Sequence, residues 1–336
     1  MIITNKVSSI GLTTFGVDVQ IDTLIEINDI SDFDYLERWK DKDIKILGGG
    51  SNVLLTSDIT QPLFNINNKG FSILKEEDEY VLVQIAAGEN WHDAVLWAVE
   101  NGYGGIENLS LIPGKCGAAP IQNIGAYGVE VKDVLHTVKA YDRKHGVIKF
   151  FFNQECAFDY RTSNFKTKWK GLYVITDIIL QLSKPNYHKV NTQYGAINME
   201  LKSRDITHPT IKNISDVVID IRRSKLPDPK VIGNAGSFFK NPIISKEDFI
   251  KVQLSHPDVP NYPAGENVKL AAGWLIDQCG WKGRVVGNSG TYKNQALVLV
   301  NHGEATGAEI KAVSDSIQKD VFDKFDIQLE AEVNVW

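Results

Sequence analysis

Cysteine is scarce in this sequence of 336 residues, where only Cys116, Cys156 and Cys279 occur. They are odd in number, widely separated and form no Cys-x-x-Cys pair, so we expect reduced thiols that act as small apolar residues, as in the cytosol. The chain also lacks an apolar run of membrane-spanning length and a signal peptide. These absences predict a cytoplasmic protein with no membrane partner.

The sequence also has no excess of positive charge. Lysine and arginine number 36 against 42 acidic residues, which gives a net charge of −6, and no basic run occurs. Nucleic acid is therefore excluded as an expected partner. No cluster of metal-ligating side chains is present, so no metal is expected. The length predicts two or three domains, and 43% hydrophobic residues with 23% charged residues are ordinary for a globular protein.

The stretch from Tyr103 to Gly128 is rich in glycine and alanine, and Glu107 and Lys115 are its only charged residues. A surface loop of this length is normally polar, and glycine lets the backbone approach a ligand closely. The composition is typical of backbone wrapped around a large, flat, partly apolar cofactor. A tightly packed crossing of loop and strand with no ligand explains it equally well.

A second glycine-rich segment, Gly48-Gly49-Gly50-Ser51-Asn52, lies between the apolar runs Ile44–Leu47 and Val53–Leu55. A dinucleotide fingerprint requires a further glycine at position 53 and a following helix, and a Walker loop requires Gly-Lys-Ser/Thr. Neither is present. Successive amides in such a turn form an anion-binding nest, with the Ser51 hydroxyl as an extra donor. A glycine hairpin that binds nothing is the alternative.

Periodicity and capping residues predict the regular elements. We expect helices at 91–101 behind an Asn90 cap, 217–223, 246–254 behind a Ser245 cap, 268–279 and 307–325. We expect strands at 80–87, 136–141, 147–152, 172–182 and 296–300. Tyr194 and Gly195 are expected at a loop tip, and the prolines of 225–229 predict a domain boundary. The end of the chain alternates strictly, so Glu330, Glu332 and Asn334 share one strand face, which usually means a solvated edge.

Two single residues are candidates for chemistry. Arg161 follows Phe158 and Tyr160, so aromatic neighbours can hold its guanidinium for a carboxylate, although an exposed surface arginine is the simpler interpretation. Ser237 lies between Gly236 and two phenylalanines, which is more typical of a presented hydroxyl than of a core serine, and a plain turn serine explains it equally well. Phe239 replaces the last glycine of a hydrolase Gly-x-Ser-x-Gly elbow, so a hydrolase nucleophile is not expected.

Seven motifs in one order resemble those of the UDP-N-acetylenolpyruvoylglucosamine reductase family, and the resemblance spans nearly the whole chain. They are GGGSN (48–52), IPGKCGAAPIQNIGAYG (112–128), YRTS (160–163), KLPDP (225–229), GNAGSFFKNP (233–242), AAGWLIDQCGWKG (271–283) and LEAEV (329–333). The resemblance implies an α+β fold with an FAD-binding part of the vanillyl-alcohol-oxidase type in two subdomains and an α+β substrate-binding domain. The expected limits are 1–69 and 70–225 for the FAD-binding subdomains, with strand 326–336 returning to them, and 226–325 for the substrate-binding domain. Tyr194-Gly195 matches the longer of the two family types.

The resemblance also implies the site residues, which we carry over position by position. Non-covalent FAD is expected at Gly48, Gly49, Gly50, Ser51 and Asn52, which would hold its pyrophosphate, and at Gly114, Gly117, Ala118, Gln122, Asn123 and Gly125. Substrate contacts are expected from Tyr160, Tyr194, Lys225, Asn241, Tyr262, Lys282 and Gln295. Of the catalytic residues, Arg161 would pair with the substrate carboxylate, Ser237 would donate the proton to C2, and Glu332 would help polarise the carboxylate as a protonated acid.

The activity implied is the NADPH-dependent reduction of UDP-N-acetylglucosamine enolpyruvate to UDP-N-acetylmuramate, for peptidoglycan synthesis and hence cell-wall biogenesis, cell shape and division. Hydride would pass from NADPH to N5 of FAD and then to C3 of the substrate, in a monomer. The alternatives are a flavin oxidase or dehydrogenase of the same fold and a silent nucleotide-sugar-binding protein. The sequence departs from the family pattern at Lys115, Cys116, Thr162 and Asn334, and it stops at Trp336, before the usual final strand.

Overall fold

The computed structural model describes all 336 residues, which form two compact units. The first unit contains Met1–Val7, Ile21–Gly49 and Ile59–Ser224, and the second contains Ser8–Gln20, Gly50–Asp58 and Lys225–Trp336. Each unit is therefore built from discontinuous segments. No helix is both long and apolar enough to cross a membrane.

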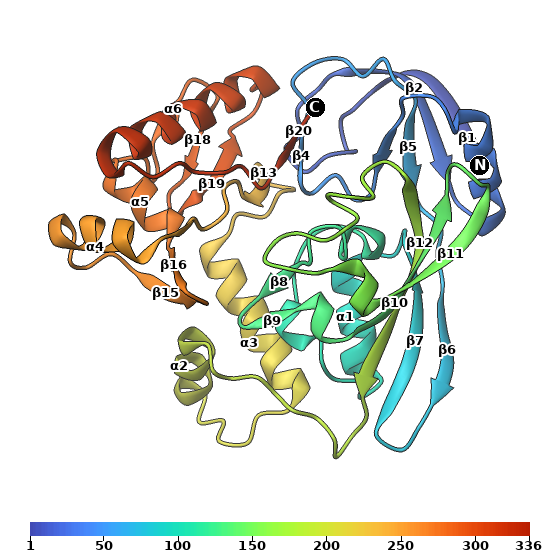
Figure 1. Cartoon of the computed structure of the whole chain (residues 1–336), viewed down its shortest axis with the longest axis horizontal. Coiled ribbons are helices and arrows are strands. Elements are labelled where there is room, and N and C mark those ends of the chain that lie inside the picture. The colour runs from blue at the N-terminus through green and yellow to red at the C-terminus, as the bar shows by residue number, and fades with distance from the viewer. The chain divides into compact units, whose positions relative to one another are not determined.

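A five-stranded antiparallel sheet dominates the first unit, in the order β11-β10-β12-β7-β6 (Figure 1). Its strands are β6 (Phe71–Glu76), β7 (Tyr80–Ala86), β10 (Leu135–Asp142), β11 (Val147–Phe152) and β12 (Tyr173–Ser183). The four strands predicted between positions 80 and 182 are confirmed within about one residue. Dense β-branched and aromatic residues made them visible, because such side chains suit a pleated, buried surface.

A second sheet of the first unit has the order β1-β2-β5-β3, and β5 pairs in parallel with both β2 and β3. Its strands are β1 (Ile2–Ser8), β2 (Gln20–Ile27), β3 (Lys45–Leu47) and β5 (Leu63–Ile66), and the 3₁₀ helix η1 (Ile30–Trp39) follows β2. Of these, only β3 coincides with a segment singled out from the sequence, the apolar run Ile44–Leu47 before the glycine turn.

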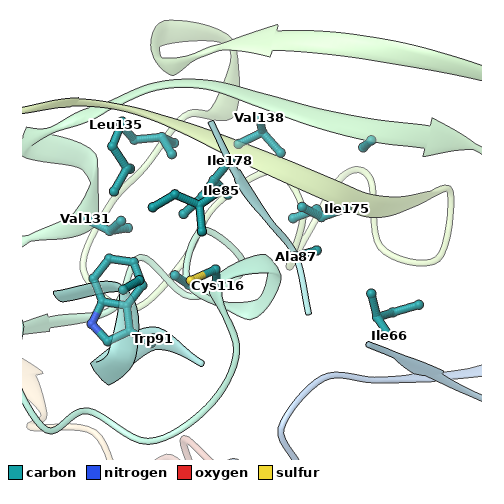
Figure 2. Close-up of a cluster of buried hydrophobic side chains, with 14 of the residues drawn as sticks. Ile66, Ile85, Ala87, Trp91, Cys116, Val131, Leu135, Val138, Ile175 and Ile178 are labelled. Atoms are coloured by element: carbon teal, nitrogen blue, oxygen red, sulfur yellow. The ribbon is translucent and has the colours of Figure 1, made fainter. Parts of the chain in front are cut away.

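Helix α1 (Trp91–Glu100) and the large sheet of the first unit share an apolar core. The helix is capped by Asn90, whose side chain accepts a hydrogen bond from the Asp93 amide, as predicted. Its buried face contributes Trp91, which packs with side chains of the large sheet such as Ile85 and Ile178. Figure 2 shows Cys116 among these side chains, and it is fully buried. Cys116 therefore serves as a small apolar core residue.

The remaining elements of the first unit correct two predictions. Helix α2 (Gly195–Ser203) begins directly after Tyr194, which is therefore a helix cap and not a loop tip. Helix α3 (Ile211–Lys225) starts six positions before the predicted 217, because Ile211 and Ile214 extend its buried face. Short pieces complete the unit: η2 (Glu107–Leu109), η3 (Cys116–Ala118), β8 (Gly125–Ala126), β9 (Val129–Glu130), η4 (Val131–Asp133) and η5 (Asn153–Cys156).

The second unit contains two antiparallel sheets and three helices. The sheets have the orders β13-β19-β18-β17 and β14-β16-β15. The strands are β13 (Gly233–Ser237), β14 (Ile243–Ile244), β15 (Asn261–Ala264), β16 (Asn267–Leu270), β17 (Val285–Val286), β18 (Ser289–Tyr292) and β19 (Gln295–Asn301). The helices are α4 (Lys246–Ser255), α5 (Ala272–Gln278) and α6 (Gly307–Phe325).

Helices α4 and α6 and strand β19 agree with the predictions, and Ser245 caps α4 as expected. The predicted helix 268–279 is wrong in its first part. Val268 pairs with Ile244 and Pro263 in the three-stranded sheet, and the helix begins only at Ala272. Residues 267–270 pair with one strand on each side, β14 and β15, and this pairing outweighs the helical periodicity of the segment.

The C-terminal end joins the second unit through a short parallel pair. Strand β20 (Asn334–Val335) pairs with β4 (Val53–Leu54), so β4 does not pair with β3. The glycine hairpin considered above is therefore wrong. The predicted alternation at the end of the chain is present, since Leu329 and Val333 are buried, Glu330 is exposed and Glu332 is half-buried.

Candidate functional site

The two glycine-rich segments meet in the first unit. A Cβ atom added to Gly49 would lie 2.9 Å from the Gly114 Cα atom, and one added to Gly48 would lie 3.5 Å from the Ala118 Cβ atom. A Cβ atom on Gly117 would lie 2.5 Å from that of Ala87. Glycine at positions 49 and 117 is therefore required for backbone to approach backbone.

The rest of the first glycine turn belongs to the second unit. Gly50 has a φ angle of 60°, and a Cβ atom there would collide with the Leu12 carbonyl group. The Gly50 carbonyl oxygen accepts a hydrogen bond of 3.1 Å from the Thr14 amide. The Asn52 side-chain amide donates to the Glu332 carbonyl oxygen at 3.1 Å. Thus two residues predicted for different tasks, Asn52 and Glu332, lie in contact.

The stretch between positions 111 and 128 is only partly buried. Ala118 is exposed, and Gly114, Gln122 and Gly125 are of intermediate exposure, although the segment is apolar. Backbone and small apolar side chains therefore remain accessible along it. A broad, partly apolar group with hydrogen-bonding edges matches such a surface, so these residues fit a flavin.

Lys115, one of the departures from the family pattern, has its ammonium group inside the first unit. It donates hydrogen bonds to the Asn65 side-chain oxygen at 3.0 Å, to the Ile66 carbonyl oxygen at 2.6 Å and to the Asn67 side-chain oxygen. Burial, with a smaller contribution from the charge of Lys69, lowers the pKa of Lys115 to about 8. At neutral pH the ammonium form therefore still ties the glycine-rich stretch to the end of β5.

Arg161 reaches the same stretch from another part of the first unit. Its guanidinium donates to the Gly125 carbonyl oxygen at 2.6 Å and to that of Asn123 at 3.4 Å, and its carbon atom lies 5.4 Å from the Tyr160 ring centroid. The prediction that an aromatic neighbour holds Arg161 is therefore confirmed for Tyr160. The side chain of Asn123 is fully buried and donates to Glu130 at 3.0 Å and to the Asp159 carbonyl oxygen at 3.1 Å. Asn123 thus braces the segment that Arg161 contacts.

Tyr194 is exposed and meets Tyr127 edge to face, with ring centroids 5.1 Å apart. Two asparagines join the chain before Tyr194 to the glycine-rich stretch. Asn108 donates to the Asn191 carbonyl oxygen at 2.9 Å, and Asn191 donates to that of Gly128 at 3.1 Å. The predicted substrate residue Tyr194 is thus anchored to the predicted cofactor segment.

The segments that carry Ser237 and Glu332 are paired in the second unit. Ser237 is exposed at the end of β13, between Gly236, with a φ angle of 68°, and the buried Phe238. The Glu332 amide donates to the Phe238 carbonyl oxygen at 2.8 Å, and Phe239 forms an isolated bridge with Ala331. A short antiparallel ladder therefore aligns the chain that follows Ser237 with the chain that carries Glu332.

The other predicted substrate residues of the second unit fall into two groups. The Asn241 side-chain oxygen accepts a hydrogen bond from the Ala272 amide at 3.0 Å. A Cβ atom added to Gly273 would lie 2.9 Å from the Gln295 side-chain oxygen. Asn241 and Gln295 therefore both lie at the start of α5. The second group lies away from the start of α5. Tyr262 is exposed on β15, and Lys225 is exposed at the end of α3. The Lys282 ammonium nitrogen lies 3.5 Å from a carboxylate oxygen of Asp277.

Sequence reasoning missed Asn65 and Asn67, whose side-chain oxygens receive the Lys115 ammonium. The available signal was two amide side chains flanking Ile66 where an apolar run ends.

Comparison with known proteins decides the family. Residues 228–336 match the family model described as UDP-N-acetylenolpyruvoylglucosamine reductase, C-terminal domain, and residues 27–150 match an FAD binding domain. A UDP-N-acetylenolpyruvoylglucosamine reductase from Flavobacterium johnsoniae is 49% identical over 324 residues, which is 96% of either chain. The chain belongs to the UDP-N-acetylenolpyruvoylglucosamine reductase family.

Further comparisons agree with this assignment. A member of the same family from Bdellovibrio bacteriovorus is 49% identical over 87% of this chain and 86% of its own. The crystal structure of the family member from Thermus caldophilus covers all of both chains with a TM-score of 0.69 at 22% identity, which supports the fold.

These findings confirm the family, the α+β FAD-binding fold class, the oxidoreductase class and FAD as the cofactor. The match to the FAD binding domain includes both glycine-rich segments. This match favours the cofactor-binding explanation, and which residues of the two segments bind FAD stays a prediction. The roles of the single site residues and the three-domain division stay predictions.

Proposed function

We propose that the chain is an NADPH-dependent enzyme that reduces the enolpyruvyl group of UDP-N-acetylglucosamine enolpyruvate to give UDP-N-acetylmuramate, acting as a monomer in the cytoplasm. The observation that supports it best is the ladder that aligns the exposed Ser237 with the chain carrying Glu332. A proton donor and a carboxyl group held by one rigid backbone unit are what protonation of an enolpyruvyl carbon requires. FAD, when bound, supplies the site that accepts hydride from NADPH and returns it to the substrate.

The chain's own residues then have separate tasks. Arg161 would bind the substrate carboxylate, because a guanidinium forms paired, charge-assisted hydrogen bonds with a carboxylate. Negative charge develops on C2 and the carboxylate when C3 is reduced, and a fixed cation stabilises it. Tyr160, stacked on Arg161, limits the positions that the guanidinium can take.

Ser237 would deliver the proton that completes the reduction. The O–H bond of its side chain breaks as the C2–H bond forms, and the alkoxide is reprotonated from solvent. Serine is a weak acid, so this transfer depends on the high basicity of C2 at that moment. Glu332, as a protonated acid, would polarise the carboxylate of the substrate's enolpyruvyl group. Lys225 and Lys282 are suited to the diphosphate of the nucleotide.

The test is the visible spectrum of the purified protein, recorded without oxygen. We expect a yellow protein that bleaches with NADPH and recovers its colour when UDP-N-acetylglucosamine enolpyruvate is added. NADH in place of NADPH is the matched control for the hydride source. Bleaching without recovery would instead favour an oxidase or dehydrogenase with another substrate, and a colourless protein that binds UDP-sugar would favour a binding protein.

A further inference from the structure

The main chain at Glu332 is held from both sides within the second unit. Its amide donates to the Phe238 carbonyl oxygen at 2.8 Å, and its carbonyl oxygen accepts from the Asn52 side chain at 3.1 Å. The next residue, Val333, is buried in the core that also contains Phe238 and Leu54. Glu332 lies between Val333 and Ala331, which packs against the same core, and Glu332 itself is half-buried.

The Asn52 side chain supplies a hydrogen-bond donor to the Glu332 carbonyl oxygen, which the backbone of β4 does not reach. The parallel pair of β4 and β20 starts at Val53 and Asn334, so its ladder ends before Glu332. Asn52 lies one position ahead of β4, and its side-chain amide extends the hydrogen bonding by one more carbonyl group. Asn52 is itself fixed, since its carbonyl oxygen accepts from both the main-chain amide and the side-chain amide of Asn334, each at 3.0 Å.

We propose that Asn52 is a positioning residue for Glu332, holding the main chain of that residue so that its carboxyl group keeps one direction. This inference rests on the proposed function, because it assigns Glu332 a catalytic task. Asn52 acts through Glu332 and touches no reacting atom in this role. Its place in the glycine turn at 48–52 thus serves the catalytic acid as well as the cofactor.

The substitution Asn52→Leu tests the proposal, because leucine keeps the branching and the number of heavy atoms of the side chain and removes the donor. In FAD-saturated protein we expect the amides of segment 330–336 to exchange with deuterium at least about tenfold faster. The matched variant is Ser51→Ala, which changes the neighbouring predicted FAD contact and leaves the Asn52 amide in place. Its segment 330–336 should exchange at the wild-type rate. Unchanged exchange in Asn52→Leu, or equally fast exchange in Ser51→Ala, would overturn the proposal.

A double-mutant cycle with Glu332→Gln separates positioning from a general loss of structure. We expect Asn52→Leu to slow the substrate half-reaction by about 10- to 100-fold in the wild-type background, and to have little further effect when Glu332 is already replaced. Effects that multiply would contradict the inference. If Asn52→Leu does not fold, Asn52→Asp removes the donor while keeping a polar side chain. The exchange measurement does not use the substrate. If the proposed function is wrong, the colour does not recover with substrate, whereas if this inference is wrong, exchange in segment 330–336 is unchanged.

Discussion

At the scale of single residues, Lys115 joins the glycine-rich stretch to the end of β5 through three oxygen acceptors. Removing a donor from buried acceptors costs about 1–3 kcal/mol. We therefore expect Lys115→Met to lower the free energy of unfolding by about that amount, measured by urea titration of FAD-free protein. It should also weaken FAD binding, measured by quenching of FAD fluorescence.

The matched control for Lys115 is Lys212→Met. Lys212 is 71% exposed and pairs only along its own helix with Asp216. Such surface pairs contribute about 0.5 kcal/mol or less. An equal loss of stability in both variants would show that the buried acceptors around Lys115 carry no special weight.

Ser237 offers a second prediction at the scale of residues. If it donates the proton to C2, Ser237→Ala should leave bleaching by NADPH unchanged and slow recovery of colour with substrate by about 10²- to 10⁴-fold or more. Stopped-flow absorbance measures both half-reactions. Ser255→Ala, an exposed serine of α4, is the control and should change neither rate. Equal slowing of both half-reactions by Ser237→Ala would remove Ser237 from the donor role.

At the scale of elements, the connection between β10 and β11 is organised by Asp142. Burial alone would raise the pKa of its carboxyl group, but hydrogen bonds from Lys149, from the His145 side chain and from the amides of His145 and Lys144 lower that pKa well below its usual range. The carboxylate therefore fixes the loop that joins two neighbouring strands of the large sheet.

The sign of the pH effect follows from that lowered pKa. The stability that Asp142 contributes is fully present above the unfolded-state pKa of about 4 and is lost as the pH falls through the lower folded-state pKa. We expect Asp142→Asn to cost about 1–2 kcal/mol at neutral pH and to make the free energy of unfolding fall less steeply between about pH 4 and pH 2. Urea titrations across that range check it. Parallel pH profiles for the variant and the wild type would contradict the assignment.

At the scale of the whole molecule, the turn at 48–52 is divided between the two compact units, with Gly49 in the first and Gly50 in the second. A ligand that binds only the folded chain stabilises it in proportion to the logarithm of its concentration. We expect free FAD at 100 times its Kd to stabilise FAD-free protein by about 2.7 kcal/mol, visible as a raised Tm in calorimetry. ADP at the same concentration is the control, since it lacks the flavin, and an equal rise with both would argue against a flavin-specific site.

The sequence alone was sufficient where the signal is local. Helix α6 was predicted at its observed limits, because its 3.6-residue periodicity lies within the helix itself. The strands β10, β11 and β12 carried their own β-branched and aromatic residues. The family, and with it the fold class and the cofactor, followed from seven short motifs in one order, which need no knowledge of contacts.

Tertiary structure alone decided everything that depends on partners distant in the chain. Val268 looked helical and became a strand residue, because strands on both sides were there to pair with it. A hairpin was one of the two interpretations of the glycine turn, yet β4 pairs with the last strand of the chain. Asn52 and Glu332 are 280 positions apart and still share a hydrogen bond. A local pattern records what a segment can form, whereas long-range pairing depends on which surfaces the folded chain brings together.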